Sequence, residues 1–237
     1  MTPTPTAAQR DVVTVSGPDA CRYLHSQVAQ DVEALEVGAG AWSLVLAPNG
    51  RVDVLARIQR RADDRFELDS EAGYGDVLAQ RLDRFKIRVD AEVAMETRDL
   101  AGTEVVGWWG SDQWDAGPEY EAARVAAGWP AMGTEIVPGE RIPAEVGVAA
   151  AAVSFTKGCY PGQELVERMD SRGSQAPHQL RIVTVAQGAS PGDPIVDPAD
   201  PDGAPVGMLT SVAGGRALGY VRRGSTVGDV PGPPPAG

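Results

Sequence analysis

Apolar and polar residues alternate over short stretches of the chain, and this pattern predicts many short strands. Residues 12–15, Val-Val-Thr-Val, are typical of a strand. Further runs predict strands at 42–46, 52–58, 65–68, 89–95, 104–109, 180–185, 206–212 and 217–221. Asn49-Gly50 lies between two of these runs and indicates a β-hairpin, because both residues tolerate positive φ.

Four other segments carry the period of a helix. A helix that starts near Pro18 has an apolar stripe at positions i, i+4 and i+8. Residues 74–85 form an amphipathic pattern. Residues 119–127 and 161–169 predict two more helices, and the second of these begins with a proline.

The order of these elements predicts an α+β protein with more than one domain. The block 42–97 reads hairpin, strand, helix, strand, which suits a small unit inserted into a first domain made of 1–41 and 98–173. Short β-rich runs separated by Pro and Gly predict a C-terminal β-barrel domain at 174–230. The Pro/Gly-rich tail 231–237 is expected to be disordered.

Charge and composition exclude several classes of partner. The chain carries 21 Lys and Arg against 33 Asp and Glu, a net charge of −12. Because Lys and Arg supply most of the affinity for phosphate backbones, direct binding to nucleic acid or to an anionic membrane is not expected. The N-terminus lacks the apolar core of a signal peptide, and no apolar run approaches the roughly 20 residues that span a bilayer. We expect a cytoplasmic, reduced, monomeric protein.

Cysteine and histidine are scarce, and the common catalytic motifs are missing. Cys21, His25, Cys159 and His178 are the full set. They could in principle form a Cys2His2 zinc site, because Cys21 and His25 lie one helical turn apart. The alternative is that Cys21 packs in the core and His25 flanks the helix, and this alternative is favoured. No dinucleotide-binding, phosphate-loop, serine-hydrolase or C-x-x-C motif occurs, and no metal site is predicted.

The segment from Thr156 to Gly173 carries most of the chemical information. Pro161 suits the first turn of a helix, so Cys159 would lie just before a helix N-terminus. The partial positive charge there favours a thiolate, and Lys157 adds to it. Cys159 is therefore a candidate reactive thiol. The alternative is a buried cysteine in a tight turn.

The same segment resembles a known family. Lys157-Gly158-Cys159-Tyr160-x-Gly162-Gln163-Glu164 resembles the hallmark K-G-C-[YF]-x-G-Q-E of the YgfZ family, whose members bind folate and are related to the glycine-cleavage T-protein, an aminomethyltransferase. Weaker matches lie at 17–31, 48–51, 120–130 and 142–145. The hallmark is the specific part of the resemblance.

The resemblance implies a T-protein-like ring of three domains around a central pocket for tetrahydrofolate or a one-carbon derivative. It also implies a role in the assembly or repair of iron–sulfur proteins, among them radical enzymes that modify tRNA. Its partners would be folate and iron–sulfur client or assembly proteins. The functional thiol would be Cys159, with Lys157 beside it.

The residues implied in folate binding are Arg124, Tyr160, Gln163 and Glu164. A planar guanidinium suits a folate carboxylate. The alternative for Arg124 is a helix-surface arginine paired with Glu121, three residues back. Gln163 and Glu164 are also expected to bond the backbone amides of the hallmark loop.

One departure from the T-protein pattern argues against catalysis. The positions of its catalytic aspartate carry Val54 and Leu55, and Asp53 is offset by one residue, which turns it to the opposite face of a strand. We therefore expect an accessory protein rather than a tetrahydrofolate-dependent aminomethyl or methyl transferase. A tRNA-binding factor is opposed by the net charge. The segment 111–119 is also shorter than in the family.

Overall fold

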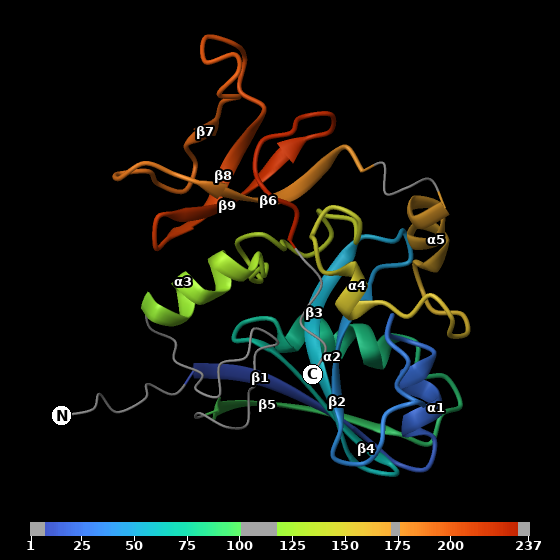
Figure 1. Ribbon diagram of the computed structural model, residues 1–237. Helices are drawn as coiled ribbons and strands as arrows, with labels where there is room; N and C mark the ends of the chain where they lie inside the picture. The colour runs from blue at the N-terminus through green and yellow to red at the C-terminus, as the bar shows by residue number, and fades with distance from the viewer. Residues whose placement is uncertain (1–7, 101–117, 172–175, 232–237) are drawn as a thin grey trace, which may run out of the picture.

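The computed structural model describes residues 8–100, 118–171 and 176–231 (Figure 1). The strands of the N-terminal part are β1 (Ala8–Ser16), β2 (Gly40–Leu46), β3 (Val52–Ala62), β4 (Arg65–Glu71) and β5 (Glu92–Leu100). The helices are α1 (Ala20–His25), α2 (Gly75–Arg84), α3 (Pro118–Ala127), α4 (Ala149–Ala152) and α5 (Gln163–Ser171). The C-terminal strands are β6 (His178–Thr184), β7 (Pro194–Ile195), β8 (Gly207–Ala213) and β9 (Arg216–Arg222).

A five-stranded antiparallel sheet in the order β2-β3-β4-β1-β5 forms the larger layer. The predicted hairpin is confirmed: β2 and β3 pair around a tight turn in which the Gly50 N–H donates to the Ala47 carbonyl at 2.8 Å. Gly50 has φ of 82°, which explains the glycine at this turn.

The position of β1 bears on the predicted inserted unit. Val12 of β1 pairs with Asp69 of β4 on one side and with Glu96 of β5 on the other. The block 42–97 therefore shares its sheet with a strand that precedes it, and is not a sheet of its own. The division of the chain into three domains remains a prediction.

The two faces of this sheet differ in polarity. Paired residues Val13, Leu68 and Ile58 share the apolar face and are fully buried, and α2 packs against β1, β3 and β5. The opposite face carries Asp69, whose carboxylate accepts from Arg10 Nε at 3.0 Å and from Arg57 Nε at 2.9 Å. All three charged residues are buried, so their mutual pairing is needed to offset the loss of water.

A four-stranded antiparallel sheet in the order β6-β9-β8-β7 makes up the C-terminal part (Figure 1). Its own core contains Ile195, Leu209, Ala217 and Val221. Helix α3 packs against β8 and β9 and so joins this sheet to the rest of the chain. Pro231 is buried and packs next to Gly128. The other residues of the tail that was expected to be disordered lie outside the described residues.

Several predicted elements are shifted. α1 ends at His25, and Val28 is buried in the turn that follows. The strand expected at 89–95 runs from Glu92 to Leu100. The expected strand at 104–109 and nearly all of the shortened segment 111–119 lie outside the described residues. No helix that the structure describes is long and apolar enough to cross a bilayer.

Candidate functional site

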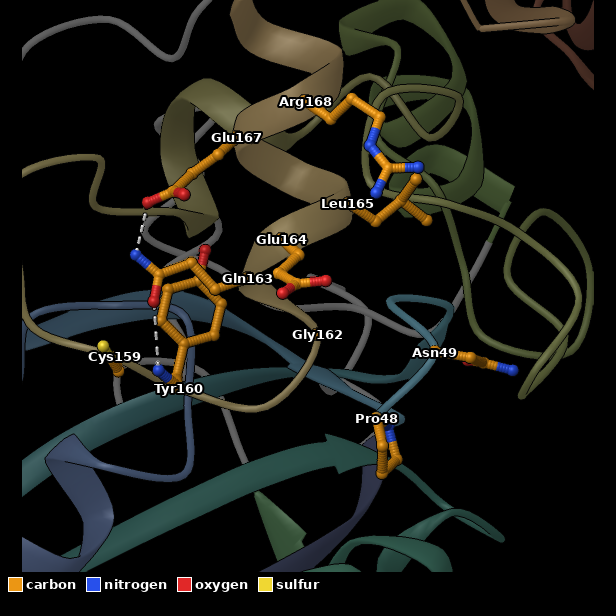
Figure 2. A pocket seen from close by; sticks show the side chains of 10 residues that line it. All are labelled: Pro48, Asn49, Cys159, Tyr160, Gly162, Gln163, Glu164, Leu165, Glu167 and Arg168. Atoms are coloured by element: carbon orange, nitrogen blue, oxygen red, sulfur yellow. Dashed lines mark hydrogen bonds between the residues drawn. The ribbon is translucent and has the colours of Figure 1, made fainter.

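A cavity of about 570 Å³ lies between the β2–β3 turn and the start of α5 (Figure 2). Four of the six predicted site residues line it: Cys159, Tyr160, Gln163 and Glu164. The remaining wall is built by Pro48, Asn49, Gly162, Leu165, Glu167 and Arg168. The structure thus brings most of the hallmark segment to one concave surface.

Two glycines allow the turn and the hallmark loop to approach closely. A Cβ at Gly162 would lie 2.7 Å from the Ala47 carbonyl oxygen, and one at Gly50 would lie 2.5 Å from Leu165 Cβ. Gly162 also has φ of 83°, a left-handed conformation that other residues rarely adopt. A side chain at Gly50 or Gly162 would therefore push the turn away from the hallmark loop and disrupt this wall of the cavity.

The left-handed Gly162 also delays the start of α5. The helix begins at Gln163, not at Pro161 as predicted, because a residue with positive φ cannot belong to a right-handed helix. Cys159 therefore lies four residues before the first helical residue. Since the field of a helix terminus falls off within about one turn, its influence on the thiol is weaker than expected.

The Gln163 side chain links the loop to the helix. The Tyr160 N–H donates to Gln163 Oε1 at 3.3 Å, and Gln163 Nε2 donates to Glu167 Oε1 at 2.6 Å (Figure 2). This confirms the expected bond from Gln163 to a loop amide. Glu164 is exposed on the cavity wall and, within the described part of the chain, makes no such bond. Burial, with a smaller effect of Glu167, raises the pKa of Tyr160 to about 12.

Lys157 holds the hallmark loop against the turn after α1. Its ammonium donates to the carbonyls of His25, Val28 (2.7 Å) and Gln30 (3.3 Å). These three acceptors match the three N–H bonds of an ammonium group. Burial lowers the pKa of Lys157 to about 8, with Asp31 opposing the effect. Lys157 therefore positions the loop.

The two cysteines lie in different surroundings. Cys159 is exposed at the cavity, which excludes the alternative of a buried cysteine. Cys21 is half-buried against the apolar core, and burial raises its pKa. Among the described residues, no group of three or more His, Cys, Asp or Glu side chains is arranged to hold a metal ion.

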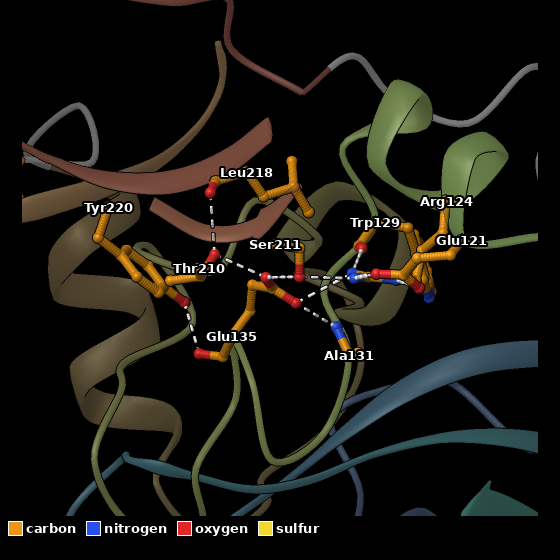
Figure 3. Close-up of polar contacts among 9 residues, drawn as sticks. All are labelled: Glu121, Arg124, Trp129, Ala131, Glu135, Thr210, Ser211, Leu218 and Tyr220. Carbon is orange, nitrogen blue, oxygen red and sulfur yellow. Dashed lines mark hydrogen bonds and ion pairs between the residues drawn. The ribbon is translucent and has the colours of Figure 1, made fainter. Parts of the chain in front are cut away.

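Arg124 lies outside the lining of the cavity, in a buried network (Figure 3). It pairs with Glu121, as the alternative interpretation predicted, through Nε at 2.9 Å and through Nη2. Unlike a surface arginine, it is only 2% exposed. Its Nη1 donates to Glu135 at 2.9 Å and to the Trp129 carbonyl at 2.7 Å.

The fifth contact joins Arg124 to the C-terminal sheet: Nη2 donates to Ser211 Oγ at 2.7 Å. Five contacts match the five N–H bonds of a guanidinium, so no donor is left for a folate carboxylate in this arrangement. Burial alone would lower the pKa of Arg124, but the bond to Glu121 and the charge of Glu135 outweigh it and raise the pKa. The predicted contact with folate remains a prediction that requires this network to open.

Glu135 is the centre of the same network. Its buried carboxylate also accepts from Thr210 Oγ1 and Ser211 Oγ, each at 2.6 Å, and its own carbonyl accepts from Tyr220 Oη at 2.8 Å. Figure 3 shows these groups converging from α3, the loop after it and the C-terminal strands. The network fastens the C-terminal sheet to the rest of the chain.

The positions that replace the T-protein aspartate are apolar and closed. Val54 and Leu55 are fully buried. Asp53 lies 3.9 Å from Arg81, and burial raises its pKa, with Arg81 opposing the rise. None of the three residues lines the cavity.

Sequence reasoning missed the contribution of Asn49, Leu165 and Arg168 to the cavity. The hairpin signal at Asn49-Gly50 was visible, but its contact with the hallmark loop joins segments about 110 residues apart. Leu165 and Arg168 lie three residues apart on α5, a helical spacing that could have placed both on one face.

Comparisons with known proteins agree with this architecture. Residues 179–230 match the family model of the CAF17 C-terminal β-barrel domain. The chain is 27% identical over 197 residues to an uncharacterised protein of Haemophilus influenzae, covering 70% of this chain and 68% of that protein. It is 24% identical over 242 residues to the mitochondrial iron–sulfur cluster assembly factor IBA57 homolog of Neurospora crassa, covering 80% of this chain and 55% of that protein.

A solved structure shows the same fold. The glycine cleavage system aminomethyltransferase T from Bartonella henselae superposes with a TM-score of 0.68 at 16% identity, over 92% of this chain and 79% of that chain. At this identity the likeness concerns the fold alone. The chain therefore has a T-protein-like α+β fold, and the comparisons support a place in the T-protein-like group that includes the CAF17 and IBA57 proteins.

Proposed function

We propose that the chain is a folate-binding accessory protein of the YgfZ type that supports the assembly or repair of iron–sulfur proteins, with tRNA-modifying enzymes among its clients. The observation that carries the proposal is the cavity, which gathers Cys159, Tyr160, Gln163 and Glu164 on a T-protein-like scaffold. Its volume of about 570 Å³ lies in the range of small-molecule sites.

The lining of the cavity suits the two ends of a folate. Tyr160 and Gln163 lie on one side, where an aromatic ring and an amide can meet a pterin (Figure 2). Arg168 and Asn49 lie on the other side, where a guanidinium can pair with the glutamate carboxylates. In this proposal Arg168, which lines the cavity, makes the contact with the glutamate carboxylates, and Arg124 would do so only if its buried network opens.

The iron–sulfur part of the proposal rests on the relatives and on the exposed thiol. One relative is named as an iron–sulfur cluster assembly factor, and the chain spans 55% of its length. Cys159 is exposed at the rim of the ligand cavity, where a partner protein can reach it. A folate bound in the cavity would then lie beside the thiol that the partner contacts.

The alternative of an aminomethyl or methyl transferase has less support. Such a reaction requires an ionised carboxylate next to the reacting amine, and the candidate positions are the buried Val54 and Leu55. Asp53 is held beside Arg81 and does not line the cavity. Ammonia release from a loaded aminomethyl carrier protein, at the rate of a glycine-cleavage T-protein, would favour the transferase.

Calorimetric titration of 5-formyltetrahydrofolate tests the proposal. We expect binding to the wild type, and a loss of about 1.5–3 kcal/mol in Arg168→Gln, the usual contribution of a charged hydrogen bond. Arg222→Gln, which changes an exposed arginine of β9, is the control. Absence of binding to the wild type would refute the folate part. For the iron–sulfur part, Cys159→Ala should fail to restore iron–sulfur enzyme activity in cells that lack this chain.

A further inference from the structure

The base of the β2–β3 turn, which forms one wall of the cavity, is bonded to the segment 139–141. The Val52 N–H donates to the Arg141 carbonyl at 2.7 Å, and the Gly139 N–H donates to the Val52 carbonyl at 2.8 Å. The guanidinium of Arg51 adds a third bond, to another carbonyl of the same segment. Since two residues of this turn line the cavity, the segment 139–141 helps to fix the position of the wall.

The side chain of Arg141 contacts the C-terminal sheet. Its guanidinium carbon lies 3.9 Å from the centroid of the Tyr220 ring, well inside the roughly 6 Å over which a cation and an aromatic ring attract each other. Tyr220 is a buried residue of β9, and its hydroxyl donates to the Glu135 carbonyl (Figure 3). Arg141 Nη1 also lies 3.9 Å from the buried carboxylate of Glu145. The ring and the carboxylate together hold the guanidinium in place.

The residues that follow Arg141 are bonded to the start of the C-terminal sheet. The Leu180 N–H of β6 donates to the Glu145 carbonyl at 2.8 Å. The Glu145 carboxylate accepts from the Ile142 N–H at 3.2 Å and lies 3.5 Å from His178 Nδ1. Arg141 therefore lies between the base of the turn, which its carbonyl contacts, and the C-terminal sheet, which its side chain contacts.

We propose that Arg141 is a positioning residue that couples the C-terminal sheet to the wall of the cavity. Its carbonyl holds the β2–β3 turn, and Tyr220 holds its guanidinium, so a displacement of the sheet moves the turn and changes the affinity of the cavity. By linkage, a ligand in the cavity also stabilises the docked sheet. Arg124 binds the same sheet through Ser211 but lies outside the lining of the cavity. This inference deepens the proposed function and rests on the cavity being its ligand site.

The contact between Arg141 and Tyr220 can be removed without touching the backbone bonds of the turn. Arg141→Met keeps the carbonyl that Val52 binds and a long unbranched side chain, but it removes the charge. Tyr220→Leu removes the aromatic ring. Tyr220→Phe is the matched control, because it loses the hydroxyl and its bond to Glu135 but keeps the ring that Arg141 contacts.

Amide hydrogen exchange of the folate-free protein tests the coupling. In Arg141→Met and in Tyr220→Leu, exchange at Val52 and Gly139 should be about three- to tenfold faster, which corresponds to one cation–π contact. Tyr220→Phe should exchange at these amides like the wild type. The double variant Arg141→Met/Tyr220→Leu should be no faster than the faster single variant, because both changes remove the same contact. The Leu180 amide is the internal control and should keep its wild-type rate in Arg141→Met.

Wild-type exchange at Val52 and Gly139 in both variants overturns the proposal. Equal acceleration at Leu180 in Arg141→Met also overturns it, because that result means a general loss of stability. Folate affinity is measured separately by calorimetry, and Arg141→Met and Tyr220→Leu should bind 5-formyltetrahydrofolate severalfold more weakly than Tyr220→Phe. Equal affinities overturn the coupling to the cavity. A wild type that binds no folate refutes the folate part of the proposed function, while the exchange rates still decide whether Arg141 positions the turn.

Discussion

Arg124 and Glu135 offer the sharpest test of how the C-terminal sheet is held. Arg124→Met removes the five donors that connect Glu121, Trp129, Glu135 and Ser211. The side chains of Arg124 and Glu135 are 2% and 0% exposed, so the substitution leaves a fully buried carboxylate without its cation.

The magnitude follows from the burial of each contact. Breaking a buried ion pair costs about 3–5 kcal/mol, because the remaining charge is desolvated and unpaired. The Glu121 carboxylate is 41% exposed, so its pair adds at most about 1 kcal/mol. We therefore expect Arg124→Met to lower the free energy of unfolding by about 4 kcal/mol, a large part of the stability of an ordinary domain.

Urea denaturation, followed by the fluorescence of the chain's tryptophans, including the buried Trp129, measures this change. Arg168→Met, which truncates an exposed arginine, is the control and should stay within about 0.5 kcal/mol of the wild type. The double variant Arg124→Met/Glu135→Leu should recover part of the loss, because it removes the stranded carboxylate. A free energy of unfolding for Arg124→Met within about 1 kcal/mol of the wild type would refute this account of the network.

Three further predictions concern the hallmark loop. Gly162→Ala should lower the free energy of unfolding in urea by at least about 2 kcal/mol, because the alanine is strained at positive φ and its Cβ meets the β2–β3 turn. Gly73→Ala, with φ of 96° but open space around it, should cost less. Equal losses would contradict the packing argument. Burial lowers the pKa of Lys157 to about 8 in the folded protein, whereas an unfolded lysine titrates near 10.4. Between these two pH values the unfolded state binds more protons than the folded state. Lys157 therefore makes the free energy of unfolding rise with pH from about 8 to 10. Lys157→Met should remove this rise when the urea midpoint is measured near pH 8 and near pH 10. An unchanged rise in the variant would contradict the assignment of the pH dependence to Lys157. Iodoacetamide should label Cys159 before Cys21 in the native protein, as located by mass spectrometry, and the reverse order would make the Cys159 thiol structural.

Local signals predicted the parts of the fold that depend on neighbouring residues. The hairpin followed from Asn49-Gly50, and helix α2 from a stripe of apolar residues. The place of β1 between β4 and β5 did not follow, because Val12 pairs with Asp69 and Glu96, which lie far along the chain. Pairing between distant strands leaves no trace in the periodicity of any one of them.

The candidate site divides in the same way. The resemblance led to Cys159 and its neighbours, and the structure places four of the six predicted residues on one cavity. For Arg124, the partner three residues back was foreseen, but Glu135 and Ser211, which are 11 and 87 residues away, were not. The burial of Arg124 depends on these distant partners. In the sequence Arg124 suits an anionic ligand, but in the folded protein its donors are bonded to Glu135 and Ser211.

The most direct test of the central claim is whether folate protects Cys159. In a Cys21→Ser background, native protein is treated with iodoacetamide with and without saturating 5-formyltetrahydrofolate, and the rate of adduct formation is measured by mass spectrometry. If folate occupies the cavity that Cys159 and Tyr160 line, it should slow labelling of Cys159 severalfold. An unchanged rate, under conditions where calorimetry shows folate to be bound, would contradict the proposed position of the ligand beside the thiol.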